Sequence, residues 1–110
     1  MATLVTFNRD QMGEGDRDLG RRILANFLRK VIAISDLEAI AFYNSGVLLA
    51  GRESPVAAEL TQLHDRGIDL LACQTCVEHF GLADRLLFPP PSSMEDIVKL
   101  MRTCEKVISI

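Results

Sequence analysis

The stretch Gly67-Ile-Asp-Leu-Leu-Ala-Cys-Gln-Thr-Cys76 places a short apolar run directly before two cysteines. Residues 68–72 follow a glycine and are mostly apolar, which is typical of a strand buried in a sheet. Thr75 and Glu78 form the T-x-x-E pattern of a capping box, so a short helix ending at Gly81 should follow. The stretch therefore predicts a strand that ends in a cysteine-containing turn.

Apolar runs of this kind alternate with helix-period segments along the whole chain. Five strands are expected, over residues 4–7, 39–43, 68–72, 86–88 and 107–110. Longer helices are expected from Leu19 to Val31, from Ser54 to Gly67 and from Ser92 to Cys104, with a helical turn over 46–50. This alternation predicts an α/β fold, in one domain over residues 1–110, with a parallel sheet covered on both faces.

Composition excludes several classes of protein. The net charge is −3 and the pI is near 5.3, so no electrostatic footprint for nucleic acid is expected. The basic residues Arg21, Arg22, Arg29 and Lys30 recur at helical spacing and are expected to form a solvated helix face. No apolar run approaches the roughly 18–20 residues of a membrane span. Three cysteines and no signal-peptide pattern predict a cytoplasmic protein rather than a secreted disulfide framework.

Three loops should meet at one edge of the predicted sheet. In parallel sheets, ligands and chemistry collect at the carboxyl ends of the strands. The loops over 8–15, 44–46 and 73–76 follow three such ends and are polar or rich in glycine. The predicted pocket residues beside the cysteines are Asn8, Gly13, Gly15, Asn44, Ser45, Gly46, Gln74 and Thr75.

The two neighbouring cysteines are the predicted catalytic residues. Cys73 ends the buried strand, and Cys76 stands at the first position of the expected helix. Free backbone N–H groups at a helix start stabilise a thiolate, so a lowered cysteine pKa is expected there. A thiolate can accept a sulfur atom as a persulfide, exchange disulfides or bind metal. Cys104, on the inner face of the last helix, is expected to be a packing residue.

These residues carry a family resemblance. The 67–76 stretch, the segment Met12-Gly-Glu-Gly-Asp16 and the segment Phe42-Tyr-Asn-Ser-Gly-Val47 resemble the DsrE/DsrF-like superfamily. Within it, the chain is most similar to the C-terminal domain of the YedF group, which are sulfurtransferase-like proteins linked to selenium metabolism. The resemblance implies a three-layer α/β/α fold with a five-stranded parallel sheet, and frequent homo-oligomers.

The resemblance also implies roles for the cysteines. The sulfur-carrying cysteine of the superfamily's sulfur-relay members matches Cys73, and the second cysteine of the YedF group matches Cys76. Gln74 departs from the glycine expected at that place. Proteins of the YedF group usually carry a sulfur-carrier domain before this one, so a separate sulfur-carrier or donor protein is an expected partner. The resulting hypothesis is sulfur or selenium relay through a Cys73 persulfide, with Cys76 as a modulating or resolving thiol and with no cofactor.

Three alternatives stay open. A Cys73–Cys76 disulfide could serve thiol redox chemistry, as in thioredoxin-like C-x-x-C motifs. Cys73, Cys76 and His79 could bind zinc with Cys104 or His64 as a fourth ligand, although structural zinc sites usually join two such pairs. We therefore predict no metal. The chain could also be a non-catalytic oligomeric binding module.

Overall fold

The computed structural model describes residues 2–110 as four parallel strands and four α-helices, with two short 3₁₀ segments. The strands are β1 (Thr3–Phe7), β2 (Leu37–Phe42), β3 (Asp69–Ala72) and β4 (Lys106–Ser109). The helices are α1 (Arg17–Lys30), α2 (Ala57–Asp65), α3 (Gln74–His79) and α4 (Met94–Thr103), and the 3₁₀ segments are η1 (Val31–Ala33) and η2 (Asn44–Ala50). The predicted α/β fold with a parallel sheet is confirmed. Over residues 2–110, no helix has both the length and the apolar character needed to cross a bilayer.

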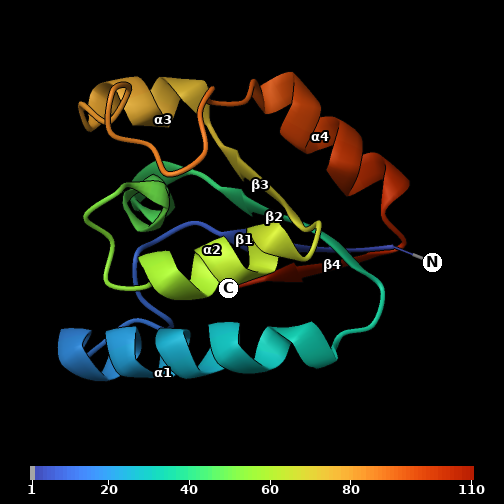
Figure 1. Ribbon diagram of the computed structural model, residues 1–110, viewed down its shortest axis with the longest axis horizontal. Helices are drawn as coiled ribbons and strands as arrows, with labels where there is room; N and C mark the ends of the chain where they lie inside the picture. The colour runs from blue at the N-terminus through green and yellow to red at the C-terminus, as the bar shows by residue number, and fades with distance from the viewer. Residues whose placement is uncertain (1) are drawn as a thin grey trace.

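The strand order β3-β2-β1-β4 determines how the helices are layered. The chain moves outward from β1 to β3 and then returns across the sheet to β4. Because crossover connections between parallel strands are right-handed, α1 and α2 cover one face and α4 covers the other. Figure 1 shows this arrangement, with α1 and α2 on one side of the sheet and α4 on the opposite side.

The core is centred on the two inner strands. All five residues of β1 are buried, and β2 is buried except at Glu38. Phe7 and Phe42, at the carboxyl ends of these strands, stack with ring centroids 5.7 Å apart. Phe27 of α1 meets Phe7 edge-on at 5.9 Å. These aromatic contacts hold α1 against the end of the sheet where the loops gather.

The prediction of five strands is wrong, because the strand expected over residues 86–88 is not formed. Residues 86–88 form no strand, and Leu86 instead makes an isolated antiparallel bridge with Gly51. Beside β3, a single residue pairs: the Ser92 N–H donates to the Ala72 carbonyl at 2.7 Å, and the Ser92 carbonyl accepts from the Gln74 N–H at 2.8 Å. The three residues before Ser92 are prolines, which have no N–H to continue the ladder.

The predicted capping box at Thr75 and the predicted start of the last helix at Ser92 are also displaced. Helix α3 begins at Gln74 with Cys73 as its N-cap, so Thr75 lies inside the helix. Helix α4 is capped by Ser93, whose hydroxyl accepts from the Asp96 N–H at 3.1 Å. The Cys73 N–H donates to the Phe42 carbonyl of β2, and the Ser92 N–H donates to the Ala72 carbonyl of β3. These backbone hydrogen bonds to the sheet keep Cys73 and Ser92 out of the helices, and this sets where each helix can start.

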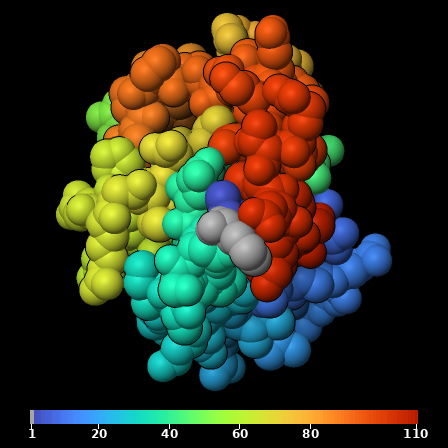
Figure 2. Space-filling view, turned by 90° about the vertical axis from the view of Figure 1, so that its right-hand side faces the viewer, coloured from blue at the N-terminus to red at the C-terminus, as the bar shows by residue number. Residues whose placement is uncertain are grey.

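An apolar stripe on α4 faces solvent. Met94, Val98 and Met101 recur at helical spacing and are exposed, Val98 to 51%. Figure 2 views the molecule from the side on which α4 and β4 lie at the surface. Large apolar side chains grouped on one face mark contact surfaces more often than single ones do. We propose that the expected homo-oligomer uses this stripe.

Replacing Val98 with Glu tests this proposal. The mass of the oligomer, measured by light scattering after size exclusion, should fall. The introduced carboxylate would have to lose its hydration water when a second subunit covers the stripe. The unfolding temperature of the separated subunit should change little, since the side chain is exposed. Lys99→Glu, one residue further along α4, is the matched control. An unchanged mass for the Val98 variant would remove the stripe from consideration.

Candidate functional site

The two neighbouring cysteines meet at the end of β3 but differ in access. The Cys73 N–H donates to the Phe42 carbonyl at 3.0 Å, which extends the pairing of β2 with β3 by one residue. Cys73 is buried, with 3% of the residue exposed. Cys76 lies almost one turn along α3 and is partly exposed. The Cys73 thiol lies near enough to contribute to raising the pKa of the Cys76 thiol.

The loop after β2 contacts the accessible thiol directly. The Asn44 backbone N–H donates to Cys76 Sγ at 3.1 Å. Asn44 has a φ of +53°, the left-handed region that asparagine tolerates better than most residues. Its Oδ1 accepts from the Ser45 N–H at 2.8 Å, which stabilises this turn locally. The sulfur of Cys76 therefore has a fixed backbone donor.

The position of that donor depends on a close approach between η2 and β1. The Phe7 carbonyl accepts from the Tyr43 N–H at 3.1 Å, and Gly46 lies directly against the same carbonyl. A Cβ atom at position 46 would overlap the Phe7 oxygen. Glycine is required here by close backbone contact, and not by its conformational freedom.

Substituting Ala for Gly46 should destabilise the protein by about 1–3 kcal/mol, because backbone atoms must move to admit the methyl group. Chemical denaturation at neutral pH would measure the loss. The neighbouring change Ser45→Ala is the control and should stay within about 0.5 kcal/mol. Equal stabilities for the two variants would contradict the close contact.

Cys76 opens into a cavity of about 260 Å³. The other lining residues are Asn44, Thr75, His79 and Phe80. The His79 and Phe80 rings meet edge-on with centroids 5.0 Å apart. These two residues were absent from the predicted pocket, although they stand three and four positions after Cys76, where side chains share a helix face.

The other predicted pocket residues do not line this cavity. Ser45 and Gly46 shape η2, and the backbone of Gln74 pairs with Ser92. Asn8, Gly13 and Gly15 belong to a loop that packs on α1 through a hydrogen bond from the Met12 N–H to the Gly20 carbonyl at 3.0 Å. That loop does not line the cavity.

Burial raises the pKa of the Cys76 thiol above its ordinary value of 9.0. The Asn44 N–H opposes this change, and the adjacent Cys73 thiol adds to it. The sequence predicts a lowered pKa, which would require a strong helix dipole. Helix α3 has only six residues, and Cys76 is already its third, so burial dominates. At neutral pH, Cys76 is therefore a thiol rather than a thiolate.

The geometry lends no support to the zinc alternative. Within residues 2–110, no three side chains of His, Cys, Asp or Glu lie close enough to hold a metal ion. Cys104 is buried, and burial followed by the charge of Glu38 raises its thiol pKa. His64 stacks on Phe88 with ring centroids 3.9 Å apart.

The structure is that of an α/β protein with a parallel sheet and with a cysteine pair at the carboxyl end of one strand. A family model described as "DsrE/DsrF-like family" matches residues 4–110. The chain belongs to this family. No curated protein matches it. The closer likeness to the YedF group stays a prediction.

Solved structures with the same fold share little sequence with this chain. The ychN protein from E. coli has a TM-score of 0.75 at 16% identity, with 100% of both chains covered. MTH1491 from Methanobacterium thermoautotrophicum, a protein of unknown function, has a TM-score of 0.74 at 18% identity, covering 99% of this chain and 98% of that one. BT1422 from Bacteroides thetaiotaomicron, also of unknown function, has a TM-score of 0.69 at 23% identity, covering 98% and 94%.

Alkylation by iodoacetamide should distinguish the thiols by access and by pKa. Cys76 should react before Cys73 and Cys104, which are buried. Because its pKa is raised, its rate should be low at neutral pH and should still be rising as pH passes 9.0. Peptide mass mapping after timed labelling gives the rate at each site. A rate that levels off below that pH would show a lowered pKa and contradict the burial argument.

Proposed function

We propose that this protein is a sulfur-relay protein that carries a sulfur atom as a persulfide on Cys76. The observation that supports this most is the hydrogen bond from the Asn44 N–H to Cys76 Sγ, in a cavity open to solvent. A fixed N–H donor stabilises negative charge on sulfur in the same way that oxyanion donors act on oxygen. Membership of the DsrE/DsrF-like family supports the same chemistry.

The transfer step is a thiol–disulfide type of exchange. The Cys76 thiolate attacks the outer sulfur of a donor persulfide, R–S–SH, and a new S–S bond forms at Sγ. The S–S bond of the donor breaks, and the donor leaves as a thiolate that takes up the proton released by Cys76. The acceptor thiol then repeats this attack on the outer sulfur of Cys76–S–SH. No net oxidation or reduction occurs in either transfer.

The carrier proposed here differs from the one that the family resemblance implies. That resemblance assigns the sulfur to Cys73, but a donor protein cannot reach a residue with 3% exposure without local opening. Cys76 is partly exposed and lines the cavity. We therefore assign sulfur acceptance to Cys76 and a resolving role to Cys73, the thiol beside it.

Sulfur loading from a cysteine desulfurase and free cysteine tests this assignment. Intact mass should increase by one sulfur atom in the wild-type protein and in the control Cys104→Ser. The gain should vanish in Cys76→Ser and persist in Cys73→Ser, because only the exposed thiol meets the donor. Loss of loading in Cys73→Ser with retention in Cys76→Ser would reverse the two roles. No loading in any form, when a known carrier is loaded alongside, would favour a non-catalytic binding module.

The effect of the neighbouring Cys73 on the pKa of Cys76 favours one second function, thiol redox exchange through a Cys73–Cys76 disulfide. In a redox protein, both single serine variants lose activity, whereas the relay requires Cys76 alone for loading. Equilibration of the cysteine pair with glutathione, read by mass after acid quenching, would measure its potential. A reduction potential outside the range of cellular thiols would argue against the redox function and favour the sulfur relay.

A further inference from the structure

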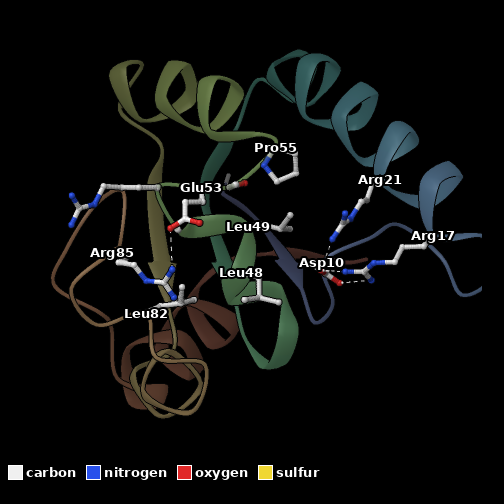
Figure 3. Close-up of a pocket in the computed structure, with 12 residues that line it drawn as sticks. Asp10, Arg17, Arg21, Leu48, Leu49, Glu53, Pro55, Leu82 and Arg85 are labelled. Carbon is white, nitrogen blue, oxygen red and sulfur yellow. Dashed lines mark hydrogen bonds and ion pairs between the residues drawn. The ribbon is translucent and has the colours of Figure 1, made fainter.

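A second cavity, of about 250 Å³, lies at the same end of the sheet and shares no lining residue with the Cys76 cavity. Leu48 and Leu49 of η2 contribute to it, along with side chains from α1 and from the segments around α2 and α3. Figure 3 shows Arg17 and Arg21 on one side of this cavity and Arg85 on the other, with the two leucines and Pro55 between them.

One end of this cavity holds two guanidinium groups around a single carboxylate. The Asp10 side chain is only 10% exposed. Its two oxygens accept from Arg17 in bidentate geometry, at 3.2 and 2.6 Å, and Oδ2 also accepts from Arg21 at 3.4 Å. Burial alone would raise the pKa of the Asp10 carboxyl, but Arg17 and then Arg21 hold it below its ordinary value. Among the residues that line the cavity, this end therefore has two guanidinium groups and one carboxylate.

The other end holds an ion pair that exchanges easily. Arg85 donates to Glu53 Oε1 at 3.0 Å and to the Gly81 carbonyl at 3.3 Å. The Glu53 side chain is 80% exposed, so this pair contributes little to stability and its carboxylate can be replaced by another. With Arg52 included, the lining has four arginines against two carboxylates. This surplus of two positive charges stands out in a chain whose net charge is −3.

If these arginines served only to stabilise the fold, each guanidinium group would be paired with a carboxylate. The Arg21 guanidinium has only the 3.4 Å contact to an oxygen that Arg17 already approaches more closely, and 44% of its side chain is exposed. Most of its N–H donors are therefore free for a ligand. Arginine clusters with unused planar donors are well suited to carboxylate and phosphate groups.

We propose that this cavity binds a small elongated dianion, that is, two carboxylate or phosphate groups joined by a short apolar segment. One anionic group pairs with Arg21, beside the Arg17–Asp10 pair. The apolar segment lies along Leu48, Leu49 and Pro55. The second anionic group pairs with Arg85 in place of Glu53. This site requires neither cysteine and is independent of the proposed sulfur relay.

Adipate, a six-carbon dicarboxylate, is a suitable probe. Titration of the full chain, followed by amide chemical shifts, should show saturable shifts at Leu48 and Leu49. Arg21→Gln and Arg85→Gln should each weaken binding roughly tenfold or more, since each removes a charged hydrogen-bond donor. Arg22→Gln is the matched control, because it lies next to Arg21 on α1 but outside the cavity, and it should bind as the wild type does.

Two further measurements make the test specific. The neutral analogue 1,6-hexanediol should cause no saturable shifts, and inorganic phosphate should bind at least severalfold more weakly than adipate because it cannot span the cavity. The double variant Cys73→Ser/Cys76→Ser should bind adipate normally, so failure of the relay would leave this site standing. No saturable shift with adipate, or equal weakening in Arg22→Gln and Arg85→Gln, would overturn the proposal. Arg85→Gln serves this purpose even if Arg21→Gln unfolds.

Discussion

The contact between Gly46 and the Phe7 carbonyl is the constraint on which both cavities depend. It holds η2 directly on the end of β1, where a side chain at position 46 would not fit. Asn44 at the start of η2 then meets Cys76, and Leu48 and Leu49 further along η2 form part of the arginine-lined cavity. One short 3₁₀ segment, positioned by one backbone contact, thus separates two chemically different sites.

The sequence predicts the sheet well where burial alone decides the structure. The continuous apolar runs of β1 and β2 can be satisfied only inside a covered parallel sheet, and they form its buried centre. The run before Cys73 forms the edge strand β3, which is only partly buried. The run over 86–88 has the same local character but a different fate. Its backbone pairs instead with Gly51 and Ala50, about 35 residues earlier in the chain, and no local pattern encodes that partner.

The site was predictable in part for a similar reason. The two cysteines stand at a strand end, and the topology of a parallel sheet places that end beside the loop after β2. Which thiol is accessible is a different matter. It depends on how the folded chain packs around each side chain, which leaves Cys73 3% exposed and Cys76 partly exposed, and burial also raises the pKa of Cys76. Arg21 similarly has the spacing of a solvated helix face, and only the fold of the preceding loop brings Asp10 to it.

The division between the two cavities has a chemical consequence for the proposed relay. A guanidinium beside Cys76 would lower its pKa, yet Arg17, Arg21 and Arg85 line the other cavity, away from the thiol. Cys76 therefore stays protonated at neutral pH, and oxidants react slowly with a protonated thiol. A sulfur donor must supply the base or positive charge that converts it to a thiolate. On this account reactivity is gained only in the complex, so the structure protects the carrier thiol until its partner docks.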